Sequence, residues 1–355
     1  MEIKNNCKYF RGDIPCIFHK KYQVHCDDCN YFEPIKEKIL IIKLGAAGDV
    51  IRTTPVLRKL REVFPDAEIT WLTQYPIFVP QKYVNNILAW NLENVLWLQS
   101  RRFDFLFNLD KDREALGLAN IISARTKKGF LPDDFGKCAP ADNNAEHKWL
   151  TGIYDDVSRQ NKKSYPEEIF EIFGFSYNRE KYILELPPAK PEFDLPDTEK
   201  IIGLNTGCGT RWLTRLWGEK NWIELSNMLS EKGLIPLLLG GPVEDEMNRK
   251  IAQNSPACYL GTFKIEDFLH LVNRCSAVVT SVTMAMHIAL ALEKKLVLLN
   301  NIFNKNEFEL FGLGKILEPE GKNCLGCYRN TCPKECMSTI SPQLVFDTIQ
   351  ELLKG

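Results

Sequence analysis

The chain has 355 residues, which is enough for two α/β domains. It is 45% hydrophobic and 26% charged, an ordinary globular composition that excludes a largely disordered chain. The 45 Lys and Arg residues and the 46 Asp and Glu residues give a net charge of −1, so no basic excess points to nucleic acid as a partner.

The sequence carries no membrane or secretion signal. No apolar run reaches the roughly 18 residues that a bilayer-spanning helix needs. The chain begins MEIKNNCKYF, without the apolar core of a signal peptide. We therefore expect a cytoplasmic protein, and peripheral contact with the inner membrane stays open.

Twelve cysteines are many for a cytoplasmic protein, and eight of them form two clusters that each contain a C-x-x-C pair. The clusters are Cys7, Cys16, Cys26 and Cys29, and Cys324, Cys327, Cys332 and Cys336. Without a secretion signal, metal binding is favoured over disulfides. Four thiolates suit tetrahedral zinc or an iron–sulfur cluster. We expect structural zinc, with an iron–sulfur cluster, iron, or free buried thiols as alternatives.

Residues 1–37 form a Cys/His-rich module with little apolar periodicity. A module of this size cannot bury much core, so a bound metal could supply the missing folding energy. His19 and His25 are spare candidate ligands beside the four thiols.

The pattern over residues 38–190 predicts a Rossmann-like domain, because apolar strands alternate with helical segments. The expected strands are Ile39–Leu44, Glu68–Leu72, Ile87–Trp90 and Phe103–Leu109. The expected helices are Val50–Phe64, Glu114–Ala124, Ala145–Arg159 and Pro166–Phe173. A proline-rich stretch, Pro187–Pro196, then reads as a linker.

Residues 198–318 repeat this alternation and predict a second Rossmann-like domain. The expected strands are Ile201–Leu204, Leu234–Leu239, Ala277–Thr280 and Leu296–Leu299. The expected helices are Trp222–Glu231, Val243–Gln253, Ile265–Arg274 and Thr283–Leu292. Residues 319–355 hold the second Cys cluster and a last helix, Ser341–Leu353, with Ser341 as its N-cap. We expect the two domains to face each other across a cleft.

Asp49 follows the first strand in the stretch KILIIKLGAAGDVIRTTPVL. The Gly45–Gly48 turn is neither a G-x-G-x-x-G dinucleotide motif nor a Walker A loop, which argues against a nicotinamide dehydrogenase and a P-loop kinase. Asp49 is either the N-cap of the following helix or a general base that faces the cleft.

In the second domain, the loop NTGCGT precedes three basic residues, Arg211, Arg215 and Lys220. Backbone amides of Thr206 and Gly207 with a basic side chain would hold a diphosphate. The alternative is that Arg211 and Arg215 are ordinary surface residues of a loop. Glu244 could bind ribose hydroxyls or simply complement a helix N-terminus. His287, on an apolar helix, is more often a satisfied core residue than a catalyst.

Several motifs together resemble glycosyltransferase family 9, the bacterial heptosyltransferases. They are ILIIKLGAAGDVIRTTPVLRKL, FDFLFNLD, NTGCGTRWLTRLWGEKNWIEL, LLLGGPVEDE and VVTSVTMAMHIALAL. The resemblance implies a GT-B fold and an inverting, metal-independent transfer from a nucleotide-diphosphate sugar, typically ADP-heptose. The acceptors it implies are lipopolysaccharide core sugars or another lipid-linked glycan, and some family members modify proteins.

The resemblance also implies residue roles. Asp49 falls on the catalytic base, Arg215 on the phosphate-binding Lys, and Glu244 on the ribose-binding acid. Thr283 and His287 fall in the segment that lines the diphosphate. There the family usually has Asp, a small residue and Gly, whereas this chain has Val282, Thr283 and Met284. A degenerate GT-B core that acts in binding or assembly is therefore the competing hypothesis, and an iron–sulfur redox protein is a third.

Overall fold

The computed structural model describes residues 2–198, 200–322, 324–333 and 335–354, and these form two compact units. Unit 1 holds the described parts of 1–45, 55–149 and 169–176. Unit 2 holds those of 46–54, 150–168 and 177–355. The chain thus passes into unit 2 directly after Gly45, for one short helix, and returns to unit 1 at Pro55. The domains expected from the sequence, 38–190 and 198–318, are continuous stretches, whereas each unit combines several separate stretches of the chain. The expected domain limits therefore remain predictions.

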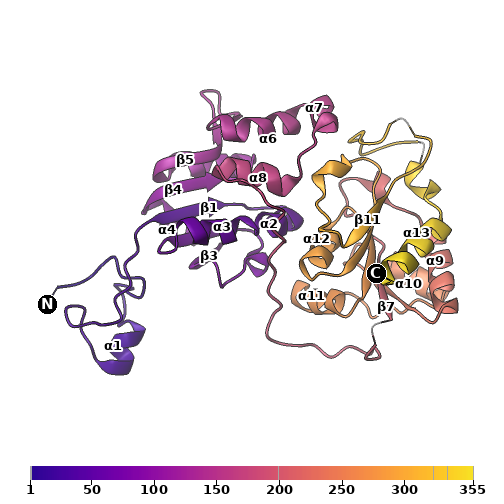
Figure 1. Cartoon of the computed structure of the whole chain (residues 1–355), viewed down its shortest axis with the longest axis horizontal. Coiled ribbons are helices and arrows are strands. Elements are labelled where there is room, and N and C mark those ends of the chain that lie inside the picture. The colour runs from indigo at the N-terminus through magenta and orange to yellow at the C-terminus, as the bar shows by residue number, and fades with distance from the viewer. Residues whose placement is uncertain (1, 199, 323, 334, 355) are drawn as a thin grey trace. The chain divides into compact units, whose positions relative to one another are not determined.

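A six-stranded sheet forms the centre of unit 1, in the order β3-β2-β1-β4-β5-β6 (Figure 1). Its strands are β1 Lys38–Ile42, β2 Glu68–Thr73, β3 Asn86–Ala89, β4 Arg102–Asn108, β5 Ser123–Pro132 and β6 Cys138–Pro140. Neighbouring strands are parallel, except that β6 is antiparallel to β5. Central strand β1 pairs with β2 and β4, and its residues 39–42 are fully buried, as a continuous apolar run predicts.

Helices α4 and α5 contribute Leu98, Ala115 and Leu118 to the core that covers this sheet. The helices of this part of the chain are α3 Val56–Val63, α4 Leu92–Gln99, α5 Arg113–Ile121, α6 Asn143–Ile153 and α8 Tyr165–Phe173. Helices α6 and α8 each contain residues of both units.

Two predicted helices are wrong in extent. The helix expected over Val50–Phe64 is two helices, α2 Ala47–Thr53 and α3, because Pro55 lacks an N–H and its ring clashes with the preceding turn. The helix expected over Ala145–Arg159 is α6 followed by α7 Asp155–Gln160. Strands β5 and β6 were not predicted, since β5 is largely polar and only partly buried and β6 is very short.

Unit 2 contains a five-stranded, all-parallel sheet in the order β11-β10-β9-β7-β8. Its strands are β7 Ile201–Asn205, β8 Ile235–Leu239, β9 Ala277–Ser281, β10 Lys295–Leu299 and the unpredicted edge strand β11 Gly314–Leu317. The strand order reverses between β7 and β9, so the crevice at their carboxyl ends is the expected ligand position in such a sheet.

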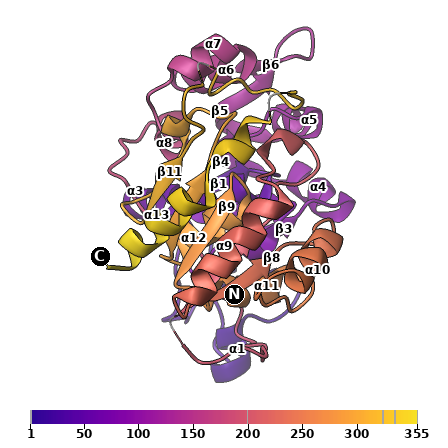
Figure 2. The ribbon, with the colours of Figure 1, turned by 90° about the vertical axis from the view of Figure 1, so that its right-hand side faces the viewer.

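The helices of unit 2 include α9 Glu219–Glu231, α10 Asp245–Gln253, α11 Ile265–Asn273, α12 Met284–Ala291 and α13 Pro342–Lys354. Helices α9 and α13 lie side by side over one core that includes Trp222 and Val345 (Figure 2). The N-cap expected at Ser341 is confirmed, because Ser341 Oγ accepts the Leu344 N–H at 3.2 Å.

The N-terminal module is built differently from both sheets. Residues 2–37 contain one short helix, α1 Ile17–Tyr22, and an isolated bridge between Cys7 and Pro34. None of their side chains is buried. Within the described parts of the chain, no helix combines the length and the apolar character that crossing a membrane requires.

Candidate functional site

A cavity of about 470 Å³ lies at the carboxyl ends of β7, β8 and β9 in unit 2. Its walls are the loops 207–209 and 240–244 and the first residues of α12. Phe263, Ile265 and Phe268 add an apolar side. Its position is the one that the reversal of strand order predicts, and its size suits a nucleotide-sized ligand.

Arg215 places a buried positive charge in the wall of this cavity. Its side chain is only 7% exposed, and its guanidinium donates to the backbone carbonyls of Trp212, Val282 and Cys208. Burial lowers the pKa of Arg215. Among the described residues no carboxylate forms an ion pair with it. A buried charge held by neutral groups alone is costly, so this cation is prepared for an anion from outside the chain.

Glu244 also lines the cavity. Its Oε2 accepts the Gly241 N–H at 2.9 Å. A Cβ atom at Gly207 would lie 2.1 Å from Glu244 Oε1, so only glycine at this position leaves room for the carboxylate. Although Glu244 is the N-cap residue of α10, its side chain forms no capping hydrogen bond to that helix. Its carboxylate therefore stays at the cavity.

Asn205, the last residue of β7, connects the walls of the cavity. Its amide donates to Gly207 O at 3.3 Å, Thr280 Oγ1 at 3.0 Å and Thr283 Oγ1 at 3.4 Å. Thr283 is the N-cap of α12, and its side chain makes no capping bond to the helix. The N-terminal amides of α12 therefore face the cavity, where a helix N-terminus favours negative charge.

The structure brings five of the predicted site residues onto this one cavity: Gly207, Arg215, Glu244, Thr283 and Met284. Thr206 is not in the lining, because its side chain is buried and its hydroxyl donates to Asn248 Oδ1 of α10 at 2.5 Å. His287 and Asp49 are also outside the lining.

Asp49 lies inside α2 and is not its N-cap, which is Ala46, so the capping interpretation is wrong. Its carboxylate is 31% exposed and pairs with Arg52, at 3.0 Å from Nε and 2.8 Å from a terminal nitrogen. The Arg52 guanidinium lies 3.6 Å from the centre of the Tyr165 ring. Burial acts to lower the pKa of Arg52, but the Asp49 carboxylate together with Tyr165, Glu307 and Tyr182 outweighs this effect, and the pKa of Arg52 is raised. Asp49 is thus oriented by a charged neighbour while it remains accessible.

His287 connects α2 to α12. A Cβ atom at Gly48 would lie only 2.4 Å from His287 Cδ2, so the two helices meet at this glycine. His287 is buried, and its Nδ1 has no hydrogen-bond partner. Burial, helped by the positive charge of Arg52, lowers the pKa of His287 to about 3. The imidazole is therefore neutral at physiological pH, and packing rather than charge is its observed role.

Sequence reasoning missed the residues that hold the loop before α2. In unit 1, Asp110 at the end of β4 pairs with Lys43 and accepts the Leu44 N–H, and both ionic side chains are buried. This pair ties the end of β1 to the end of β4 beside Gly45. A lysine that interrupts an apolar strand, and an aspartate that ends another, were the available signals. Arg52 was also missed, although its spacing of three residues from Asp49 is that of a helical ion pair.

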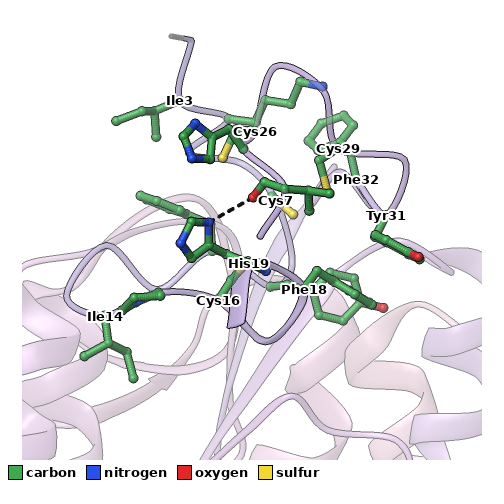
Figure 3. A pocket seen from close by; sticks show the side chains of 16 residues that line it. Ile3, Cys7, Ile14, Cys16, Phe18, His19, Cys26, Cys29, Tyr31 and Phe32 are labelled. Atoms are coloured by element: carbon green, nitrogen blue, oxygen red, sulfur yellow. Dashed lines mark hydrogen bonds between the residues drawn. The ribbon is translucent and has the colours of Figure 1, made fainter. Parts of the chain in front are cut away.

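The first Cys cluster lines one cavity together with His19 and His25 (Figure 3). The second lines a cavity with the segment 213–218. All eight are free thiols, and no three Cys, His, Asp or Glu side chains of the described residues lie close enough to share a metal ion. Asn323 and Lys334, within the second cluster, lie outside the described residues. The structure therefore does not assemble the tetrahedral zinc sites that the spacing predicts, and bound metal remains a prediction.

These features define a class. Two parallel α/β sheets, one of which carries a cavity with a buried cation and a carboxylate at the reversal of strand order, characterise proteins that bind nucleotide-like anions.

Comparison with known proteins finds similarity to one family. The model of "Glycosyltransferase family 9 (heptosyltransferase)" matches residues 168–336. Lipopolysaccharide heptosyltransferase 1 of Pseudomonas aeruginosa is 22% identical, over 89% of this chain and 98% of the relative. A family 9 glycosyl transferase from Veillonella parvula has a TM-score of 0.68 at 18% identity, over 91% of this chain and 99% of its own. E. coli heptosyltransferase WaaC with ADP has a TM-score of 0.63 at 15% identity, over 89% of this chain and 99% of its own.

The family model and the relatives support the resemblance to glycosyltransferase family 9 that the motifs indicate. The predicted enzyme class, a glycosyltransferase, is confirmed, since the named relatives are transferases. The predicted α/β fold with parallel sheets is confirmed as well, and it matches the heptosyltransferase structures.

Proposed function

We propose that the protein transfers a heptose-like sugar from a nucleotide-diphosphate donor, of the ADP-heptose type, to a glycan acceptor such as the lipopolysaccharide core. The observation that carries this proposal is Arg215, a buried cation in a nucleotide-sized cavity whose described hydrogen-bond partners are all neutral carbonyls. Relatives with matching architecture are named as lipopolysaccharide heptosyltransferases, and one of them was solved with ADP.

The cavity offers a place for each part of such a donor. The diphosphate would meet Arg215, the amides of the loop 207–209 and the N-terminus of α12. The ribose hydroxyls would bind the Glu244 carboxylate. The base would pack against Phe263 and Phe268 on the apolar side.

Asp49 would act as the general base in this reaction. It would take the proton of the acceptor hydroxyl while that oxygen attacks the anomeric carbon and the bond from this carbon to the diphosphate oxygen breaks. The electron pair leaves with the diphosphate, whose charge Arg215 would stabilise. Attack from the side opposite the leaving group inverts the anomeric carbon. Arg52 would keep the Asp49 carboxylate oriented and ionised for the proton transfer.

The second candidate function is sugar-nucleotide binding without turnover. Val282 and Met284 favour it, because they stand where the family resemblance implies Asp and Gly in the diphosphate segment. In the structure, the Val282 carbonyl accepts from Arg215. The backbone of this segment thus contacts Arg215, and the acidic residue that the family resemblance implies is absent.

Release of ADP separates the two functions. The purified chain is mixed with ADP-heptose and a lipopolysaccharide core acceptor that lacks heptose, and ADP and product are measured. We expect turnover in the wild type and a loss of about 100-fold or more in Asp49→Asn, the size of a typical general-base contribution. Donor binding without turnover would favour the binding protein. Full activity in Asp49→Asn would remove Asp49 as the base.

A further inference from the structure

Arg215 is carried by a turn that has little support of its own. The turn is η2, the three-residue 3₁₀ helix Leu213–Arg215, in which Arg215 is the buried residue. Leu213 is 57% exposed, so no apolar side chain anchors the turn in the core. A 3₁₀ helix has poorer hydrogen-bond geometry than an α-helix and is used only in short pieces. Contacts from outside the turn are therefore needed to hold its backbone in place.

The first of these contacts comes from strand β9. Ser281, the last residue of β9, is buried and donates its hydroxyl to Arg215 O at 2.8 Å. The next residue, Val282, accepts a hydrogen bond from the Arg215 guanidinium. The backbone and the side chain of Arg215 are thus both bound to the same short stretch.

The second contact comes from Asn301, two residues after the end of β10. Asn301 is 2% exposed, and its amide donates to Thr214 O at 2.8 Å and to Cys336 Sγ at 3.4 Å. A carbonyl oxygen can only accept, so the amide nitrogen faces the turn. One buried side chain therefore joins the turn that carries Arg215 to the second Cys cluster.

The chain around the second Cys cluster adds two more contacts to this region. Thr214 Oγ1 donates to Arg329 O at 3.0 Å, and Trp217 Nε1 donates to Ile340 O at 2.7 Å. Thr214 precedes Arg215 and Trp217 follows it. The chain is therefore held both before and after the arginine.

The Cys-rich loop is itself fixed beside Asn301. The Gly326 N–H donates to Asn301 O at 3.0 Å, and the Tyr328 N–H donates to Ile302 O at 2.9 Å. Asn301 thus contacts η2 through its side chain, and the Cys-rich loop through both its side chain and its backbone. It is the residue at which the loop and the turn meet.

We propose that Asn301 is a positioning residue for donor binding, and that the second Cys cluster belongs to the support of the donor site. By holding the backbone of η2, Asn301 keeps the Arg215 guanidinium where the second phosphate of the donor would lie. A side chain that touches a ligand depends on supporting hydrogen bonds for its position. The inference rests on the proposed function, because it takes Arg215 as the diphosphate-binding residue.

Calorimetry of the full-length chain with ADP and with AMP tests this role. Asn301→Ala should weaken ADP binding about 3- to 10-fold, the effect of about one hydrogen bond, and leave AMP binding unchanged. A merely structural role would not separate the two nucleotides. Wild-type affinity for ADP in Asn301→Ala, or an equal loss for ADP and AMP, would overturn the positioning role.

Asn300→Ala is the matched control. Asn300 is 1% exposed, and its amide donates to Phe303 O and Glu318 Oε1, both at 2.9 Å. In both asparagines Oδ1 is buried and has no hydrogen-bond partner among the described residues. Neither partner of the Asn300 amide belongs to η2, so Asn300→Ala should bind ADP as the wild type does. An equal loss in the two variants would contradict a specific action on the turn.

A second variant carries the test if Asn301→Ala does not fold. Thr214→Val keeps the size of a partly exposed side chain and removes its bond to Arg329 O. It should also weaken the binding of ADP and not that of AMP. Wild-type binding of ADP in Thr214→Val would show that the Cys-rich loop does not support the turn.

Combining Asn301→Ala with Arg215→Met shows which residue the asparagine acts through. In the Arg215→Met chain, Asn301→Ala should cause no further loss of ADP affinity. A further loss there would contradict the role. If the wild type binds ADP no better than AMP, the proposed donor site is wrong and this role falls with it. If the wild type prefers ADP and Asn301→Ala keeps that preference, only the positioning role is wrong.

Discussion

Arg215 and Asp49 illustrate two ways in which a charged side chain is prepared for a ligand. Arg215 is nearly buried, its hydrogen bonds go to backbone carbonyls and its guanidinium lies near the Trp212 and Phe303 rings, so no negative group among its described contacts balances the charge. Asp49 is partly exposed and oriented by Arg52, which in turn lies against the Tyr165 ring. The first arrangement suits binding of a leaving group, and the second suits proton transfer from an acceptor.

His287 makes stability depend on pH. Its pKa is about 3 in the folded chain, because of burial and the nearby Arg52, against about 6.5 when unfolded. Below pH 6.5 the unfolded state therefore binds the extra proton, and stability falls as pH falls from 6.5 towards 3. At pH 5 the loss from this residue is about 2 kcal/mol.

Urea unfolding at pH 5.0 and 7.5 measures this effect. His287→Gln cannot titrate, so its free energy of unfolding should change less between these pH values than that of the wild type, by about 2 kcal/mol. Comparing the two chains cancels the other titrating groups. An equal pH dependence in both would show that His287 titrates normally in the folded chain.

At the scale of elements, α12 connects the parts of the proposed site. Its first residues line the cavity of the proposed donor site, and His287, one turn further along, packs against Gly48 of α2. Asp49 follows Gly48 directly. The position of the proposed base therefore depends on the close approach of these two helices, which the glycine permits.

Substituting Gly48 tests that contact. In Gly48→Ala the new methyl group would meet His287 Cδ2 at 2.4 Å, so overpacking should destabilise the protein by about 1–3 kcal/mol. Activity should fall as well, since α2 carries Asp49. The measurement is thermal unfolding together with the rate of ADP release.

Gly117 provides the matched control for this substitution. It also lies in a helix, α5, but a Cβ atom there meets nothing within 4 Å. Gly117→Ala should leave activity unchanged and stabilise the chain by up to about 1 kcal/mol through helix propensity. If Gly48→Ala behaved like Gly117→Ala, the helices would not be in contact as described.

For the whole molecule, the sequence predicted most of the two sheets because buried parallel strands require continuous apolar runs. Strands such as β5 and β11, which are polar or at an edge, carry no such signal. The cavity loops were predictable because carboxyl ends of parallel strands share one edge. The surroundings of Asp49 were not, since Arg52 meets Tyr165 only when segments 46–54 and 150–168 fold together.

The same limit applies to the cysteines. Spacing predicts that thiols gather, and each cluster does line one cavity. Spacing does not give the distance between the thiols, which decides between a single ion and a larger cluster.

The binding of ADP to the full-length chain, measured by calorimetry, tests the donor site most directly. The wild type should bind ADP more tightly than AMP, because the second phosphate meets Arg215. Arg215→Met should weaken ADP binding about 10- to 100-fold, the effect of losing a hydrogen bond to a charged group. Arg249→Met, which removes an exposed arginine on α10, should bind as the wild type does. No binding of ADP, or equal affinity in Arg215→Met, would contradict the assignment of this cavity as the donor site.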